Sequence, residues 1–388
     1  MYNLETIIEE NIAKAISDSA DSYRRIGKLK MSKRLYLKAL KLRERLSLTN
    51  QTYYQPLIAE TLSSLAYVSQ EENRYDLAIE YHLGAIFMIE EIYDSNPTEK
   101  YIYMLANSYT NMADLYRKSF KYSKAEFFYN EALKIYKKLP EDELSQSKMK
   151  LLNIYNHLSI VCNAENKFQE TKDAYMGALD IYAHLVNDES DEYRDELGTL
   201  LFELGTLYFK HKHQNRAGEV YLNAIEILLY LSQKDANRYK DMLAVTFHNL
   251  AQIYTSQLDY ANALSAYRAS LKNYVELAED NPLKYSPYIA IIFKDLALFY
   301  KKQNKVELAQ YFHLKVVDSY IDLTHYNESA YSLKLVSSII DGVTLYQQHT
   351  LSLYQAESIL KDYREDREKK LELLYEIHSI REEKSYVY

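Results

Sequence analysis

The sequence contains little glycine and proline, no tryptophan and a single cysteine. It has 7 Gly and 5 Pro among 388 residues, whereas average usage would put these two residues together at roughly 12% of a chain. Tight turns and phosphate-binding loops need glycine, so the shortage argues against β-sandwiches, barrels and Rossmann-like sheets. Cys162 has no second cysteine to pair with, which suits a reducing compartment.

Long apolar runs and an excess of positive charge are also missing. The chain has 55 acidic and 47 basic residues and a net charge of −8, so nucleic acid is not expected as the main partner. The N-terminal segment MYNLETIIEENIAKAISD lacks the basic stretch and apolar run of a signal peptide, and no segment approaches the length of a membrane span. We predict a cytoplasmic protein without membrane insertion.

What the chain does contain is a repeat of about 46 residues. The segments LSSLAYVSQEENRYDLAIEYHLGAI, YTNMADLYRKSFKYSKAEFFYNEAL and FHNLAQIYTSQLDYANALSAYRASL share one pattern of small and aromatic positions. The first small position recurs every 46 residues, with one interval of 47. Its eight occurrences are Ala20, Ala66, Ala113, Ser159, Gly205, Ala251, Ala297 and Val343.

Within a repeat the apolar spacing is helical. Phe247, Leu250, Ala251 and Tyr254 step by 3, 1 and 3 residues and so form one stripe of a helix. A polar stretch over 256–259 separates this stripe from a second one. Small residues let two antiparallel helices approach, and the neighbouring tyrosine fills the flanking space. Each repeat is therefore predicted to be an antiparallel helix pair.

This pattern resembles the tetratricopeptide repeat (TPR) family, which has large, small and aromatic positions in the first helix and small, aromatic and small positions in the second. The usual period is about 34, so each repeat here carries about 12 extra residues. With NPxKY-like linkers and NLAxxY cores, it looks like the long, kinesin-light-chain-like class that is plentiful in bacteria. The resemblance implies an all-α, right-handed α-solenoid of eight antiparallel helix pairs over 1–366.

A C-terminal capping helix is expected over 367–388, because a solenoid needs a polar outer face at its end. Leu371, Leu374, Tyr375 and His378 fall on one face of that helix. We expect this face to cover the last repeat.

No sequence motif predicts catalysis, a cofactor or a metal. The patterns GxxxxGK[ST], GxGxxG and GxSxG are absent. Cys162 stands at a position that is tyrosine in six other repeats, which favours a packed structural cysteine over a nucleophile. His211 and His213 flank a lysine in an inter-helix turn without CxxC or HExxH nearby, so a solvated turn is favoured over a metal site.

The candidate binding surface is the concave groove, which the first helices line in TPR families. The resemblance places residues two before the first small position in this groove. An asparagine there contacts bound peptide in kinesin-light-chain-like repeats, and Asn111 and Asn249 match it. The alternative is that they are merely exposed, as the outer face of any helix is polar. The predicted partner-binding residues are Asn107, Asn111, Asp114, Asn153, Asn156, His157, His248, Asn249, Gln252, Lys294, Asp295, Lys301 and Lys302.

We predict a non-enzymatic scaffold, adaptor or sensor whose groove binds a peptide or a partner helix. The alternative is a peptide-responsive bacterial regulator whose superhelix changes pitch when a ligand binds. The lack of a distinct effector bundle before the repeats counts against this alternative. A clamp for chaperone tails is excluded, because Leu298 follows Lys294 at the position where that clamp needs an asparagine.

Overall fold

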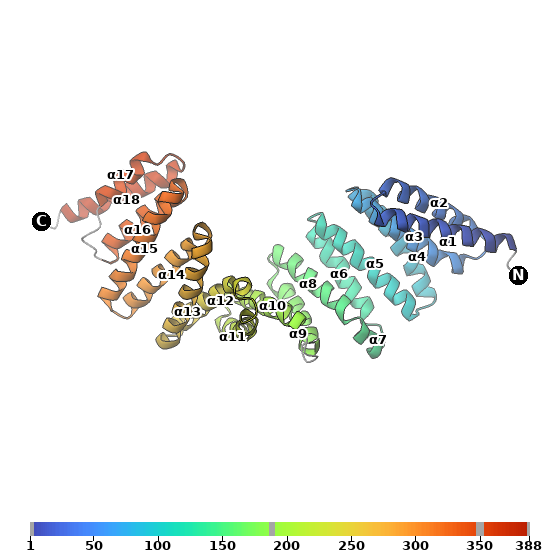
Figure 1. Ribbon diagram of the computed structural model, residues 1–388, viewed down its shortest axis with the longest axis horizontal. Helices are drawn as coiled ribbons and strands as arrows, with labels where there is room; N and C mark the ends of the chain where they lie inside the picture. The colour runs from blue at the N-terminus through green and yellow to red at the C-terminus, as the bar shows by residue number, and fades with distance from the viewer. Residues whose placement is uncertain (1–3, 186–190, 347–352, 386–388) are drawn as a thin grey trace. The chain divides into compact units, whose positions relative to one another are not determined.

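The structure, a computed structural model, describes residues 4–185, 191–346 and 353–385. Within these ranges there are eighteen α-helices and no β-strand. The predicted all-α fold is therefore confirmed. The chain divides into two compact units, residues 1–188 and residues 189–388, which are described separately (Figure 1).

The N-terminal unit holds four antiparallel helix pairs and one short extra helix. The pairs are α1 (Leu4–Arg25) with α2 (Leu29–Ser47), α3 (Gln51–Glu71) with α4 (Tyr75–Ser95), α5 (Glu99–Lys118) with α6 (Tyr122–Tyr136), and α8 (Lys148–Ala164) with α9 (Phe168–Leu185). The sequence did not predict α7 (Glu141–Gln146). It follows Pro140, whose missing amide hydrogen prevents the chain from continuing as one long helix.

The C-terminal unit holds the other four pairs and a final helix. They are α10 (Asp191–Lys210) with α11 (Gln214–Ser232), α12 (Ala236–Ser256) with α13 (Tyr260–Asp280), α14 (Pro282–Lys302) with α15 (Val306–Tyr326), α16 (Glu328–Thr344) with α17 (Leu353–Asp362), and then α18 (Arg367–Ser385). We call the first helix of each pair its A-helix and the second its B-helix. Within each unit a B-helix packs against the A-helix of the next pair. The division into repeats over 1–366 and a cap over 367–388 stays a prediction.

The turn between the two helices is the same in the first seven pairs. One residue adopts a left-handed conformation with φ between 57° and 73°, and the next amide donates to the carbonyl five positions earlier, at 2.8–3.0 Å. This is the Schellman end of a helix. Only one of the seven is glycine, so the scarcity of glycine did not exclude tight turns. The left-handed residues are Gly27, Asn73, Phe120, Asn166, Lys212, Leu258 and Asn304.

The first small position of every repeat is buried, and Gly205 shows why it must be small. A Cβ atom added there would lie 2.6 Å from two ring carbons of Tyr221. That ring cannot easily move, because Tyr221 is fully buried and its hydroxyl accepts from the Asn249 amide at 2.8 Å. The close approach of α10 and α11 therefore depends on the missing side chain.

We expect Gly205→Ala to destabilise the protein by about 1–3 kcal/mol, because the added methyl overpacks the crossing. Gly218→Ala is the matched control, since Gly218 is also helical and its nearest neighbour would be at 3.9 Å. That change should stabilise by about 0.5–1 kcal/mol through helix propensity. Urea unfolding of both variants measures the difference. Equal changes of the same sign would contradict the packing.

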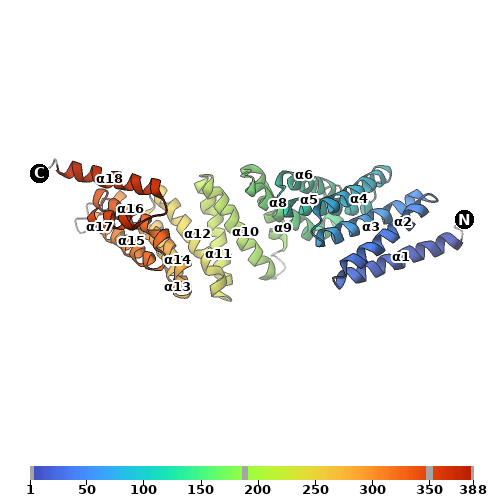
Figure 2. The same cartoon turned by 90° about the horizontal axis from the view of Figure 1, so that it is seen from above.

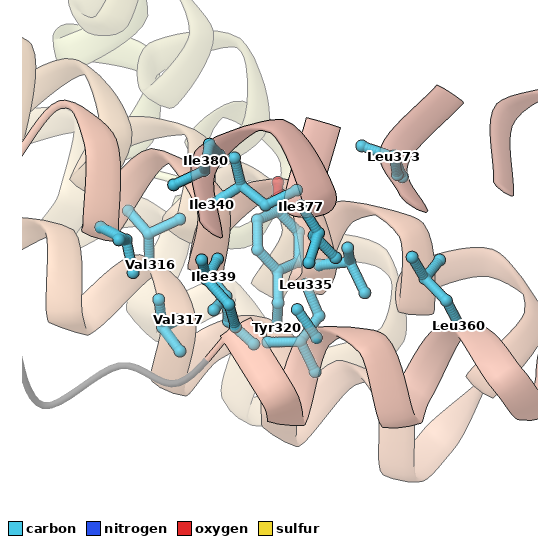
Figure 3. Packing of buried hydrophobic residues seen from close by; sticks show 14 of the residues in the cluster. Val316, Val317, Tyr320, Leu335, Ile339, Ile340, Leu360, Leu373, Ile377 and Ile380 are labelled. Atoms are coloured by element: carbon cyan, nitrogen blue, oxygen red, sulfur yellow. The ribbon is translucent and has the colours of Figure 1, made fainter. Parts of the chain in front are cut away.

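The helix α18 lies along α16 and α17 (Figure 2) and covers the last pair, but not with the face expected from the sequence. Leu373, Ile377 and Ile380 are buried in one cluster with Ile340 and Leu360 (Figure 3). Of the predicted face, Leu371, Tyr375 and His378 are exposed and Leu374 is partly buried. The stripe next to the predicted one is inward because it is wholly aliphatic, whereas the predicted stripe includes a phenol and an imidazole that need polar partners.

Candidate functional site

The predicted binding residues all belong to A-helices, α5 and α8 in the N-terminal unit and α12 and α14 in the C-terminal unit. We call the partly or fully exposed side chains of the A-helices the A-helix face of each unit. Side chains of successive A-helices contact each other across it. The Tyr67 hydroxyl of α3 donates to Asn111 Oδ1 of α5 at 2.6 Å, and Asp114 Oδ1 of α5 lies 3.1 Å from His157 Nδ1 of α8.

Several predicted residues of the N-terminal unit hold buried tyrosines of the B-helices. The Tyr136 hydroxyl donates to Asn107 Oδ1 at 2.9 Å, and Asn156 Nδ2 donates to the Tyr182 hydroxyl at 3.4 Å. Asn153 differs from them, because it is exposed. Asn107 and Asn156 are therefore already engaged within the protein.

Asp114 is the most heavily used of these residues. Its Oδ1 accepts from the Tyr129 hydroxyl at 2.5 Å and lies 3.6 Å from Arg117 Nη2. Burial would raise the pKa of the Asp114 carboxyl, but hydrogen bonds from His157 and Tyr129 outweigh it and hold the pKa below its usual value. The ionised carboxylate of Asp114 is therefore bound by side chains of the protein itself. The same arrangement recurs in the first pair, where the Tyr36 hydroxyl donates to Asp21 Oδ1 at 2.5 Å.

In the C-terminal unit the structure brings three predicted residues together. Asp295 Oδ2 of α14 lies 2.7 Å from His248 Nε2 and accepts from Gln252 Nε2 at 2.6 Å, both from α12. A small cavity of about 190 Å³ lies beside this cluster, and Leu298 and Lys302 contribute to its lining. The cluster links the neighbouring A-helices α12 and α14. The cavity beside it is a depression in the A-helix face.

In each of the two asparagines that match the family pattern, only one of the two polar atoms of the side-chain amide is hydrogen-bonded to a described residue. Asn111 accepts through Oδ1, and its Nδ2 donates to no described residue. Asn249 donates from Nδ2 to the Tyr221 hydroxyl, and its Oδ1 accepts from no described residue. Each unit thus keeps one amide group available for a bound backbone, a donor at Asn111 and an acceptor at Asn249.

The lysines of α14 are the more accessible predicted residues. Lys294 Nζ lies 3.6 Å from Asp341 Oδ2 and its side chain is half-exposed. Lys301 Nζ lies 5.3 Å from the centre of the Tyr346 ring, which is a cation–π distance. Lys301 and Lys302 are both exposed. These three side chains make one end of the α14 face basic.

Sequence reasoning missed the apolar side chains of the face. Tyr67, Ile160 and Leu298 are exposed, and each directly follows the first small position of its repeat. The sequence could have shown this, because the other repeats have a polar residue at the same position. These residues are Asp21, Asp114, Thr206, Gln252 and Thr344. The repeat register therefore marks these three positions as candidates for contact with a partner.

The other chemical candidates gain no support from the structure. Among the described residues, no three His, Cys, Asp or Glu side chains are grouped so that they could hold a metal ion. Cys162 is fully buried, and burial raises the pKa of its thiol to about 12, so the reactive thiolate is not populated near neutral pH. No described helix combines the length and apolarity of a membrane span.

A family model matches part of the chain. Residues 57–138 match the family model of the tetratricopeptide repeat. Among solved structures, BtubC (BKLC) from P. vanneervenii is 24% identical over 65% of this chain and 92% of its own, with a TM-score of 0.41. The apo form of RapI is 16% identical over 90% and 86% of the two chains, with a TM-score of 0.46.

A third solved structure is a STAND protein with a tetratricopeptide repeat sensor from Pyrococcus horikoshii. It is 13% identical over 90% of this chain and 47% of its own, with a TM-score of 0.46. The comparison with curated proteins gave no match.

Proposed function

Because the chain carries tetratricopeptide repeats, we propose that it is a non-enzymatic, cytoplasmic interaction module, a scaffold, adaptor or sensor that binds a peptide or partner helix on its A-helix face. Helix-pair arrays present extended surfaces of this kind, and their affinity comes from side chains spread over several repeats. The assignment to the long, kinesin-light-chain-like class and to bacteria belongs to the same proposal.

The observation that carries the proposal is the surface of α14. Leu298 is exposed beside the 190 Å³ cavity, and Lys294, Lys301 and Lys302 surround it on the same helix. An exposed apolar side chain with basic neighbours fits a segment that combines an apolar anchor with acidic residues. Within the same unit, Asn249 Oδ1, which accepts from no described residue, would accept from the backbone of a segment that reaches it, and Asn111 offers a donor on the N-terminal unit.

The proposal predicts that Leu298→Asp abolishes measurable binding and that Lys301→Ala with Lys302→Ala weakens it about tenfold at low salt and less at high salt. The first change removes the anchor, and the second removes charges that salt screens. A photo-crosslinker at position 298 identifies the partner, which is then titrated against each variant by calorimetry.

Leu222→Asp is the control, because Leu222 is exposed on the B-helix α11. It should leave the affinity unchanged. If Leu222→Asp weakened binding while the α14 variants did not, the partner would lie on the B-helix face and the proposal would be wrong.

A peptide-responsive regulator is the second candidate. The contacts of Asp114 with His157 and of Asp295 with His248 join neighbouring A-helices. A ligand that competes for these side chains would therefore change the spacing of adjacent repeats. Small-angle scattering with the identified partner peptide distinguishes the two candidates. A reduced radius of gyration favours the regulator, and an unchanged one favours the scaffold.

A further inference from the structure

A cavity with an unusual lining lies between the first helix pair and the first helix of the second pair. It has a volume of about 360 Å³ and lies between α1 and α3, with Tyr36 and Arg43 of α2 in its lining. Figure 2 shows these three helices together at the N-terminal end of the chain. Cavities of roughly 300–1,000 Å³ are typical of small-molecule sites, and this one is at the lower end of that range.

Arg43 departs from the repeat pattern at a core position. In the six following repeats the corresponding residue, four after the third small position, is a buried tyrosine, isoleucine or leucine. Arg43 is equally buried, with only 8% of its surface exposed. A charged group thus occupies a place that large apolar side chains fill elsewhere. The six counterparts are Ile89, Tyr136, Tyr182, Leu228, Tyr274 and Tyr320.

The guanidinium of Arg43 is held only by neutral groups. Nη1 donates to the Leu57 carbonyl at 3.1 Å and to the Thr61 hydroxyl. Nε and Nη2 donate to no described residue, and no described carboxylate forms an ion pair with this arginine. Burial lowers the pKa of Arg43, while the nearby charges of Glu60, Asp18 and Glu10 raise it. None of these carboxylates lies within ion-pair distance of the guanidinium, so an anionic group that entered the cavity would supply the missing partner.

Ser17 of α1 gives an independent sign of a missing partner. It lines the same cavity, is only 9% exposed, and its hydroxyl has no hydrogen-bond partner. The corresponding residue of the fourth pair is Asn156, which donates to the hydroxyl of Tyr182. With Arg43 in place of that tyrosine, the first pair has lost the internal partner of Ser17. Buried hydroxyls are normally bonded, so this one also indicates a ligand.

The charges around the cavity restrict what the ligand can be. The carboxylate of Glu10 accepts from the hydroxyls of the exposed Tyr53 and the buried Tyr54, and the carboxylate of Asp21 accepts from the hydroxyl of Tyr36. Those of Asp18 and Glu60 also line the cavity and bind no described side chain. Lys14 also lines the cavity, so the lining carries two basic groups beside the acidic ones. A dianion would be repelled by the acids and a simple cation by Arg43 and Lys14. A zwitterion satisfies both sets of groups.

We propose that this cavity binds a free α-amino acid with a large apolar side chain. Its carboxylate accepts from Arg43 Nε and Nη2 and from the Ser17 hydroxyl, and its ammonium group faces Asp18 and Glu60. The side chain takes the space beside Tyr54 and Leu57, next to the place that an apolar residue fills in other repeats. Because the ligand contacts both α1 and α3, it would fix the first two pairs against each other.

The test is calorimetric titration and thermal unfolding with L-leucine and L-phenylalanine. We expect at least one of them to bind and to raise the melting temperature. Leucinamide lacks the carboxylate and N-acetylleucine lacks the ammonium group, so each should bind at least about tenfold more weakly.

Arg43→Tyr introduces the residue found at this place in four other repeats, so it should raise the melting temperature without ligand and abolish binding. Ser17→Ala keeps the charge and should weaken binding roughly threefold to tenfold. Lys41→Tyr, at an exposed position of the same helix α2, should leave binding unchanged.

The proposal would be wrong if neither amino acid bound to the parent protein. It would also be wrong if leucinamide and N-acetylleucine bound as tightly as leucine, or if Arg43→Tyr still bound the amino acid. A lower melting temperature of Arg43→Tyr without ligand would also count against it, because it would give the arginine a structural role. If Arg43→Tyr did not fold, unchanged affinity of Ser17→Ala would decide against the site. These measurements are independent of any partner on α14.

Discussion

Replacing Ile377 with aspartate is expected to release α18 from the last helix pair and to make the protein self-associate. Ile377 is fully buried and packs in the cluster that contains Ile340 and Leu360. The change removes an aliphatic side chain and places a carboxylate in an apolar site, a loss of about 3–5 kcal/mol or more. The apolar edge of the last pair then meets water, and a repeat array with such an edge aggregates.

Tyr375→Asp is the control, because Tyr375 lies on the same helix with 78% of its surface exposed. Light scattering and thermal unfolding of both variants test the expectation. Only Ile377→Asp should increase the particle mass and lower the melting temperature. If both variants kept the particle mass and the stability of the parent protein, α18 would be a tail and not a cap.

Acidification is expected to weaken the N-terminal unit by up to about 3 kcal/mol through His82 alone. This histidine of α4 is fully buried, and neither ring nitrogen has a hydrogen-bond partner. Burial lowers its pKa from 6.5 to about 4. As the pH falls, the unfolded chain takes up the proton first, so the stability is complete above pH 6.5 and is lost between pH 6.5 and pH 4. Each pH unit in this window costs about 1.4 kcal/mol.

His82→Phe should remove this part of the pH dependence while keeping an aromatic ring in the core. His184→Phe is the control, because His184 is exposed on α9 of the same unit. Hydrogen exchange of the α3 and α4 amides measures the local opening free energy at neutral and acidic pH. A slope in His82→Phe as steep as in the parent protein would show that His82 is not the titrating group.

The repeat period explains why so much of the fold could be predicted. A small residue every 46 or 47 positions specifies where two helices cross, and the crossing at Gly205 tolerates no side chain. Such constraints act between residues close in the chain, so they appear in the sequence as a regular repeat of small residues. The prediction failed for the inward face of α18 because it did not weigh the polar atoms of Tyr375 and His378 against the wholly aliphatic stripe beside them, which the last pair buries.

The candidate site was less predictable, because the use of a polar side chain depends on what lies opposite. Asp114 and Asn107 looked like groove residues, yet tyrosines of α6 reach them through the pair. Conversely, the sequence analysis did not single out Arg43, and only the structure shows that it is buried with no ionic partner among the described residues.

The sequence by itself determined the helix pairs, their order and the residues at their crossings, since these follow from local periodicity and side-chain volume. Only the tertiary structure decided which polar groups are satisfied within the protein and which remain for a ligand. Those hydrogen bonds join residues 15 to 47 positions apart, on different helices. Whether they form depends on distances of a few tenths of an ångström, which packing sets and the repeat pattern does not encode.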